Sequence, residues 1–564
     1  MLIFPSACVK WIVDGYGTMM SEIREQLDKP VDMVVAPVGV GSFAQAVVNH
    51  FKRSEAPTKV MTVEPDTAAC MYKSFQQGQL TALDTSPTIM AGLDCGTPST
   101  IAWPLLRDAV DSSLTVSDYE AHEAAMYIQE KTGVSAGPCG ASGLAALRRL
   151  TSQDRLKLGL NKDSVIVLFC TEGSREYQVP RSVSTDDPIE LTQALVHINS
   201  ASPTLGSVGG PGETEVARFV TAWLEHRDIE THWIEPTRGR PSVIGVTRGS
   251  GGGKSLMLNG HLDTVTLMGY DGDPLGGSIE DGKLYGRGAA DMKCGLAAAI
   301  VTLARVKKLG LRGDVILAAV ADEEDTSIGT EQVLEAGWRA DAALVNEPTN
   351  MEINNAHRGF VWLKVRVHGV AYHGSRPDLG VDAISKAGHF LVELDRYAEN
   401  LLRRPGHPAA GHPSVHASLI KGGEELSSYP AECTIDLERR TIPGETPESV
   451  RQEIEELLER VRQTVSAFRY DVEVTFHRPP FELPAQHQFA KLFTEVASEV
   501  LGHEIVPKSA PFWTDCALLF DAGIPCLLWG PKGDGLHSKC EWVDVESIKT
   551  VTEGLVLTAT RFCK

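Results

Sequence analysis

Two short segments of this chain carry polar side chains at a spacing that suits metal ligands. Residues 258–265 read LNGHLDTV, an apolar run that ends in His261 and Asp263, and Asp291 follows in GRGAADMKCG. Side chains of a β-strand alternate between its faces, so residues two apart project to the same side. A carboxylate there can hold an imidazole, and this predicts a metal site at a strand end. Asp291 is predicted to open the Ala-rich helix that follows it.

Further candidate ligands also come directly after apolar runs. The run DVILAAVA leads to Asp322, Glu323 and Glu324, AALVN leads to Glu347, and PCLLWGP leads through a glycine-containing loop to His537. Ligands at the carboxyl ends of sheet strands would follow such runs. Two imidazoles and three or four carboxylates in one cleft suit two zinc ions, or cobalt or manganese in their place.

Each of these residues alone has a simpler interpretation. One H-x-D is a weak signal, and Glu323 and Glu324 alone would be a solvated surface pair. Asp291 alone would be a helix-start carboxylate that compensates the helix dipole. Five separated segments in the right order at strand ends would rarely arise by chance, and the joint pattern therefore favours the metal site.

Composition sets limits on the class of protein. A chain of 564 residues is expected to form two or more domains, and its formal charge of −21 argues against a nucleic-acid or anionic-membrane surface. Eleven cysteines without a C-x-x-C pair fit reduced thiols. Pro5 and Lys10 interrupt the apolar opening MLIFPSACVKWIV, which predicts neither a signal peptide nor a membrane span. We therefore expect a soluble, cytoplasmic protein.

The polar stretch SREYQVPRSVSTDDP at residues 174–188 separates two regions, and we expect a first segment at residues 1–182. Within it, VDMVVAPVGVGS reads as a buried strand that runs into a glycine-rich turn, with FAQAVVNHFK as the next helix. Turn amides and a helix N-terminus in this layout can hold an anion. By itself, however, GVGS is more often only a tight turn.

Several longer motifs of this first segment are similar to those of a known enzyme family. DGYGTMMSEI, VAPVGVGSFAQAVV, VEPDTAACMYKSFQQGQL, TIMAGLDCGTPS and GPCGASGLAAL, within residues 10–180, resemble the C-terminal part of diaminopropionate ammonia-lyase. That is a pyridoxal-phosphate enzyme of the tryptophan-synthase-β fold type. Its Schiff-base lysine lies upstream of these motifs, and Lys10, Lys29 and Lys52 do not sit in the matching motif. The resemblance implies a truncated α/β lyase segment that does not bind pyridoxal phosphate, with no cofactor-binding residues.

A second resemblance covers residues 186–564. GHLDTV, GRGAADMKCG, ADEED, NEPTN, AYHGSRPDLGVDAI, ERRTIPGE and HSKCEWV resemble the metallopeptidase family of acetylornithine deacetylase, succinyl-diaminopimelate desuccinylase, aminoacylase and glutamate carboxypeptidase. The resemblance implies two bound divalent metals, zinc with cobalt as the alternative. Asp291 would bridge them, and His261 and Glu347 would complete opposite metals. Glu324 and His537 would fill the remaining protein positions.

The same resemblance assigns chemistry to two further carboxylates. Asp263 would orient His261, and Glu323 would take a proton from a water between the metals and pass it to the leaving amine. Neither a G-x-S-x-G elbow nor a cysteine in a plausible catalytic context appears in this half of the sequence. The implied activity is hydrolysis of the amide bond of an N-acyl amino acid or small peptide with a free carboxylate. The alternatives are a pyridoxal-phosphate lyase with an auxiliary hydrolase half, and a non-catalytic fusion.

Residues 355–478 differ from their surroundings in the order of their strand and helix patterns. They are predicted to form a domain that is inserted into the catalytic domain of residues 183–354 and 479–564. Alternating strands such as FVWLKVRVHG and two amphipathic helices fit a ferredoxin-like lid. One of these helices is predicted to begin with Thr446 as its N-cap and Pro447 at its first position. In the resembling family this lid also forms a homodimer interface.

Two lid residues are candidate substrate-binding groups. His373 in YHGSRP matches the family histidine that reaches the partner subunit's active site and stabilises the developing oxyanion. Arg440 in RRTIPG matches the arginine that binds a substrate carboxylate. The neighbouring Arg439 is the alternative residue for this role. Many relatives carry an asparagine before the proline at the position of GGEELSSYP, and this chain does not. The substrate contact of that asparagine is therefore not assigned to a residue here.

Overall fold

The computed structural model describes residues 6–52, 58–85 and 87–564, with side chains from residue 11 onward. The first five residues of the apolar opening lie outside the described residues. The chain forms two compact units, Met1–Thr185 with Arg218–Thr231, and Asp186–Ala217 with His232–Lys564. Among the described helices, none is both long and apolar enough to cross a membrane.

The first unit is built on a parallel four-stranded sheet in the order β3-β2-β1-β4. The predicted strand, turn and helix are confirmed, because β1 runs into Gly41 at φ 107° and α2 follows at Ser42. Its strands are β1 (Met33–Pro37), β2 (Lys59–Pro65), β3 (Ser112–Val116) and β4 (Ile166–Leu168). Its helices are α1 (Ser6–Gln26), α2 (Ser42–Phe51), α3 (Cys70–Gln77), α4 (Trp103–Ala109), α5 (Asp118–Thr132), α6 (Pro138–Arg149) and α7 (Ser152–Lys157).

The second unit contains a nine-stranded mixed sheet in the order β17-β12-β19-β11-β7-β10-β6-β5, with β18 paired to β12. Its three central strands, β11, β7 and β10, are parallel, buried along their whole length and rich in aliphatic residues, as expected for strands covered on both faces. The strands are β5 (Glu230–Ile234), β6 (Ser242–Thr247), β7 (Leu256–His261), β10 (Val315–Val320), β11 (Ala342–Val345), β12 (Asn354–His357), β17 (Phe481–Glu482), β18 (Lys508–Ala510) and β19 (Cys526–Leu528).

Helices and a small second sheet accompany this large sheet. The buried helix α10 packs against α16 and α8, and the small sheet has the order β20-β21-β9-β8. The helices are α8 (Pro188–Val196), α10 (Cys294–Lys307), α11 (Ile328–Glu335), α14 (Gln488–Leu501), α15 (Cys516–Asp521) and α16 (Val545–Phe562). Helix α9 (Thr214–Glu225) begins in this unit and continues into the segment Arg218–Thr231 of the first unit. The small strands are β8 (Ile279–Glu280), β9 (Lys283–Tyr285), β20 (Gly533–Asp534) and β21 (Trp542–Asp544).

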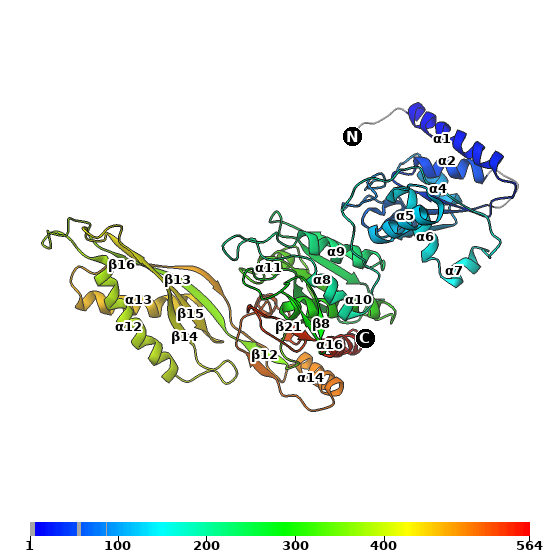
Figure 1. Cartoon of the computed structure of the whole chain (residues 1–564). Coiled ribbons are helices and arrows are strands. Elements are labelled where there is room, and N and C mark those ends of the chain that lie inside the picture. Colours follow the sequence, from blue (N-terminus) through cyan, green and yellow to red (C-terminus); the bar gives the residue numbers. More distant parts are fainter. Residues whose placement is uncertain (1–5, 53–57, 86) are drawn as a thin grey trace. The chain divides into compact units, whose positions relative to one another are not determined.

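The inserted lid is ferredoxin-like, as predicted, with the chain order β13 (Gly359–His368), α12 (Ala383–Arg403), β14 (Ser414–Gly422), β15 (Glu432–Thr441), α13 (Pro447–Thr464) and β16 (Arg469–Arg478). Its antiparallel sheet has the order β14-β15-β13-β16 (Figure 1). Alternate residues of β13 and β15 are buried against the apolar faces of α12 and α13. Thr446 caps α13 through a hydrogen bond from the Ser449 backbone, and Pro447 begins the helix as predicted.

Candidate metal centre

The strand order brings four of the candidate residues together. His261 is the last residue of β7, Glu323 and Glu324 follow β10, and Glu347 follows β11. Because β10, β7 and β11 are parallel neighbours, the residues just beyond their carboxyl ends meet at one edge of the sheet. Two overlapping groups of possible ligand atoms, each within 4.8 Å, form there: His261, Glu323 and Glu347, and His261, Asp291 and Glu324.

Asp291 reaches the same cluster from a different kind of element. It does not open the long helix as predicted: it lies in a tight turn at residues 289–293 with a non-helical backbone (φ −112°, ψ 94°), and α10 begins only at Cys294. The carboxylate of Glu541 holds this turn, accepting the backbone N–H groups of Ala290 and Asp291, both at 2.9 Å, and of Gly288 at 3.1 Å. These hydrogen bonds stabilise a turn that the helix pattern alone does not predict.

The carboxylate of Asp291 lies between two imidazoles. Its Oδ1 is 3.2 Å from His261 Nε2, and its Oδ2 is 3.3 Å from His537 Nε2. Two ligand atoms on a tetrahedral zinc ion, each about 2.0–2.1 Å from the metal, would be roughly 3.3 Å apart. The spacing therefore fits a carboxylate that shares one ion with each imidazole.

The remaining distances indicate which carboxylate lies beside each imidazole. Glu347 Oε1 is 3.7 Å from His261 Nε2, and Glu324 Oε2 is 2.8 Å from His537 Nε2. These distances suit the pairing of His261 with Glu347 and of His537 with Glu324, which differs from the expected distribution of His261 and Glu347 over opposite metals. Both glutamates follow strands that are direct neighbours of β7, so the turns beyond β10 and β11 decide which of them lies beside His261.

Asp263 contacts His261 differently from the expectation. Because β7 ends at His261, strand alternation does not extend to Asp263, and the imidazole Nδ1–H donates to the Asp263 backbone carbonyl at 2.9 Å. The Asp263 carboxylate lies 3.5 Å from Nδ1 and accepts the backbone N–H groups of Glu323 (3.1 Å) and Glu324 (3.2 Å). It therefore ties the turn after β10 to the end of β7, and the carbonyl fixes the tautomer that leaves Nε2 as a ligand.

Burial and mutual repulsion shape the protonation of the cluster. Burial, together with the charge of Glu347, raises the pKa of Glu323 well above its usual range. Burial and the charge of Asp291 raise the pKa of Glu324 to about 7, whereas hydrogen bonds to Asp291 and Glu324 raise the pKa of His537 to about 10. Buried carboxylates that favour protons in this way are the groups a divalent cation would neutralise. The donor set of two imidazoles and oxygen atoms suits zinc or cobalt.

A buried ionic network supports the turn after β10, and the sequence pattern does not predict it. Arg240 donates to both oxygens of Glu213, with its Nη2 at 2.7 Å from Oε1, and the same Nη2 lies 2.5 Å from Asp322 Oδ1. All three side chains are at most 8% exposed. Because Asp322 directly precedes Glu323, the network holds the turn that carries Glu323 and Glu324.

The two lid candidates lie on exposed or half-buried surface. The Ser375 backbone N–H donates to His373 Nδ1, which leaves Nε2 as the protonated nitrogen of the neutral ring. Arg440 donates to Glu438 and lies over the Phe360 ring, with a third of its side chain exposed. Arg439 is fully buried and pairs with Glu445 at 2.5 Å, so Arg440 is the accessible arginine of the two.

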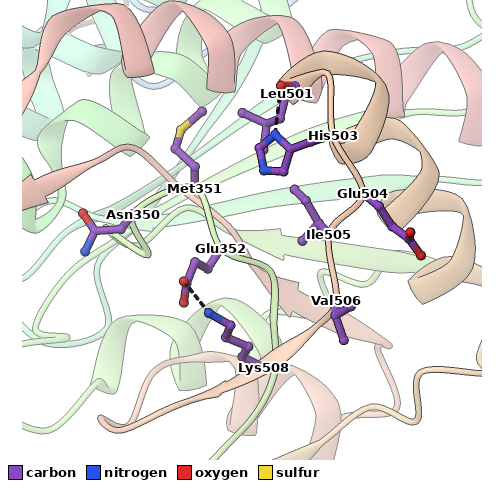
Figure 2. A pocket seen from close by; sticks show the side chains of 9 residues that line it. All are labelled: Asn350, Met351, Glu352, Leu501, His503, Glu504, Ile505, Val506 and Lys508. Carbon is purple, nitrogen blue, oxygen red and sulfur yellow. Dashed lines mark hydrogen bonds and ion pairs between the residues drawn. The ribbon is translucent and has the colours of Figure 1, made fainter.

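Two surface hollows among the described residues of this unit bear on the site. One, of about 540 Å³, shares His537 with the ligand cluster. The other, of about 450 Å³, lies between the loop after β11 and the chain beyond α14, where an ion pair joins Glu352 and Lys508 at 2.6 Å (Figure 2). No candidate ligand lines the second hollow, and only the first belongs to the centre.

Residues 257–561 match the model of peptidase family M20/M25/M40, which is more than half of the chain. The chain therefore belongs to this family, and it is a metal-dependent hydrolase that acts on amide bonds. Residues 3–172 match a separate model, the pyridoxal-phosphate dependent enzymes, which supports the predicted fusion of two unrelated segments.

Among curated relatives, the acetylornithine deacetylase of Myxococcus xanthus is 30% identical over 328 residues, covering 57% of this chain and 84% of that protein. The N-formyl-4-amino-5-aminomethyl-2-methylpyrimidine deformylase of Bacillus subtilis is 26% identical over 408 residues, covering 65% and 92%. Among solved structures, the aminopeptidase PepT of Bacillus cereus has a TM-score of 0.56 at 18% identity and covers 68% of this chain and 100% of that chain. The YXEP protein of Bacillus subtilis, a dinuclear metal binding peptidase, has a TM-score of 0.53 at 18% identity, covering 67% and 97%. These structural likenesses confirm the fold.

Proposed function

We propose that the second unit binds two zinc ions, with cobalt as the alternative, and removes the acyl group from an N-acyl amino acid or small peptide. His261, Asp291 and Glu347 would hold one ion, and Asp291, Glu324 and His537 the other. The observation that carries this proposal is the Asp291 carboxylate, which lies within 3.3 Å of both imidazoles. The deacetylase and deformylase named above, which by their names remove small acyl groups, favour this substrate class.

When bound, the two ions supply Lewis acidity, which polarises the scissile carbonyl and makes a water molecule more acidic. Glu323 is the proposed general base: its Oε2 lies 3.9 Å from His261 Nε2, and its backbone is held by Asp263. Its raised pKa favours uptake of the water proton, which the same carboxyl then gives to the leaving nitrogen. Arg440 would bind the carboxylate of the amino acid, and His373 would donate from Nε2 to the developing oxyanion.

We also propose that the protein is a homodimer joined through the lid. The sheet order leaves β14 at an edge (Figure 1). An edge strand offers backbone groups to which a second strand can pair. Leu419 and Ile420 on β14 are 68% and 55% exposed, and Ile384 and Val392 on α12 are 45% and 53% exposed. Pairing of two such edges would cover this apolar surface, and it would allow His373 to serve the partner's centre.

The experiment that tests the proposed activity is a hydrolysis screen of the purified, metal-loaded full chain. N-acetyl and N-succinyl amino acids and dipeptides are compared, and release of the free amine is measured. The proposal predicts turnover of N-acyl amino acids that is lost when the α-carboxylate of the substrate is amidated. Turnover of none of these compounds by a protein that holds two metals would contradict it. Residues 3–172 are still predicted not to bind pyridoxal phosphate.

A further inference from the structure

The 540 Å³ hollow beside the candidate metal centre has the position of a substrate subsite. One of its walls is the imidazole of His537, whose Nε2 faces Asp291 and Glu324 in the ligand cluster. Its volume lies within the range of about 300–1,000 Å³ that is typical of small-molecule sites. A substrate whose carbonyl reacts at the cluster could therefore extend one of its ends into this hollow.

Arg287 gives the hollow a fixed shape. Its guanidinium donates to the Thr266 carbonyl at 3.2 Å and to the Ser538 carbonyl at 2.8 Å, and it pairs with Glu541 at 2.8 Å. Thr266 lies on the loop after β7 and Ser538 on the loop between β20 and β21, and both loops line the hollow. The buried arginine thus joins the two loops, and its charge is already neutralised by Glu541.

The rest of the lining combines apolar walls with one available cation. Leu205, Val265 and Met268 contribute aliphatic surface, and Lys539 lies on the exposed loop next to His537. Within the described part of the chain, the ammonium group of Lys539 has neither an ion pair nor a hydrogen bond. An apolar wall with an ammonium group beside it suits a ligand that has an aliphatic chain and a terminal anion.

The two halves of the substrate can be distinguished by the groups that would bind them. In the proposed function, Arg440 of the lid takes the carboxylate of the amino acid, which is the leaving half. The hollow beside His537 is built entirely from segments outside the lid. It is therefore assigned to the acyl half.

We propose, on the basis of the proposed function, that this hollow is an acyl subsite for ω-carboxyacyl groups, and that Lys539 binds the distal carboxylate. An acetyl group would leave most of the hollow filled by water. A glutaryl group places a carboxylate at the end of a short aliphatic chain, so it matches both the walls and the cation. The α-ammonium group of an N-terminal aminoacyl residue would instead be repelled by Lys539.

The test compares N-glutaryl and N-pentanoyl derivatives of one amino acid, which share a five-carbon acyl chain and differ in the terminal carboxylate. The ratio of the two kcat/KM values is measured for the wild type and for Lys539→Met. We expect the substitution to lower the glutaryl-to-pentanoyl ratio about fivefold, the size of an exposed ion pair, and 0.5 M salt to have the same effect on the wild type. Lys539→Arg should retain the ratio.

Lys532→Met is the matched control, because Lys532 is an exposed lysine of the same segment that does not line the hollow. An unchanged ratio in Lys539→Met, or an equal fall in Lys532→Met, would overturn the subsite.

A binding measurement separates this inference from the proposed function. Glutarate and pentanoate are titrated calorimetrically into the metal-loaded protein, and Lys539→Met should weaken glutarate selectively. If no N-acyl substrate is hydrolysed, the proposed activity fails, whereas the calorimetry still decides the subsite.

Discussion

The Glu541 carboxylate accepts the backbone N–H of Asp291 at 2.9 Å and so fixes the residue that lies between the two imidazoles. Glu541 is 1% exposed and also pairs with Arg287. We predict that Glu541→Gln weakens binding of the metal ions by about tenfold or more, because groups behind the ligands have effects of this size. Metal affinity, measured by competition with a chelator, checks the prediction. Glu546→Gln, on the exposed start of α16, is the control and should bind metal normally.

A second prediction separates the general base from the ligands. Glu323→Gln should retain both metals and lower kcat by a factor on the order of 10² or more, as expected for loss of a proton acceptor. Metal analysis and steady-state kinetics of the same preparation provide the test. Asp325→Asn, in the same turn, should change kcat little. Loss of metal from Glu323→Gln would instead make Glu323 a ligand, in line with its 3.9 Å distance from His261 Nε2.

The proposed dimer predicts complementation between two inactive variants. His373→Ala and Glu323→Gln subunits each lack one group, but a mixed dimer would contain one centre with both. Activity should therefore reappear on mixing and subunit exchange, up to about a quarter of the wild-type value, since half of the dimers are mixed and each has one intact centre. Verified mixed dimers without activity would show that His373 acts within its own subunit or not at all.

The buried network of Arg240 predicts a large loss of stability. Arg240→Met would leave Glu213 and Asp322 as unpaired buried carboxylates, and breaking a buried pair in this way costs about 3–5 kcal/mol. Arg248 forms an exposed pair with Asp314, and Arg248→Met should cost less than about 1 kcal/mol. Urea unfolding of the two variants compares these values. Equal losses would mean that the network is not an important source of stability.

The first unit provides a prediction for pH dependence. Burial raises the pKa of Glu64 to about 8, although the backbone N–H groups of Met71 and Tyr72 favour the charged form. The folded state then binds the proton more tightly than the unfolded state, so stability is full below pH 4.5 and falls as the pH rises towards 8. The loss is up to about 1.4 kcal/mol per pH unit. Glu64→Gln should flatten the fall in unfolding temperature between pH 5.5 and pH 8. An identical pH profile in wild type and variant would rule out this role of Glu64.

The strand ends that carry the ligands could be predicted because buried parallel strands appear as apolar runs in the sequence. His261, Glu323, Glu324 and Glu347 each follow such a run, and parallel strands end at the same edge of a sheet. The pairing of His261 with Glu347 could not be predicted, because Glu324 also follows a neighbour of β7 and the turns beyond the two strands decide between them. That Asp263 orients His261 through its backbone carbonyl could not be predicted either, because alternation applies only inside a strand and β7 ends two residues earlier.

The supporting residues were missed because burial is not visible in a single sequence. Glu213 and Arg240 are 27 positions apart and look like ordinary charged residues, yet they pair with almost no exposure. Glu541 stands in the HSKCEWV segment that carries the resemblance, but its hydrogen bonds span about 250 positions of the chain. The preference for Arg440 over Arg439 follows from strand alternation in β15, where Arg439 faces the core.

The most direct test of the account is to remove the metal ions and return them in known amounts. The protein is treated with a chelator, dialysed, and titrated with zinc or cobalt while hydrolysis of an N-acyl amino acid is followed. We predict that the metal-free protein is folded but inactive, and that activity returns with two ions bound per chain, because the two ions supply the Lewis acidity of the reaction. Undiminished hydrolysis by the verified metal-free protein would contradict it.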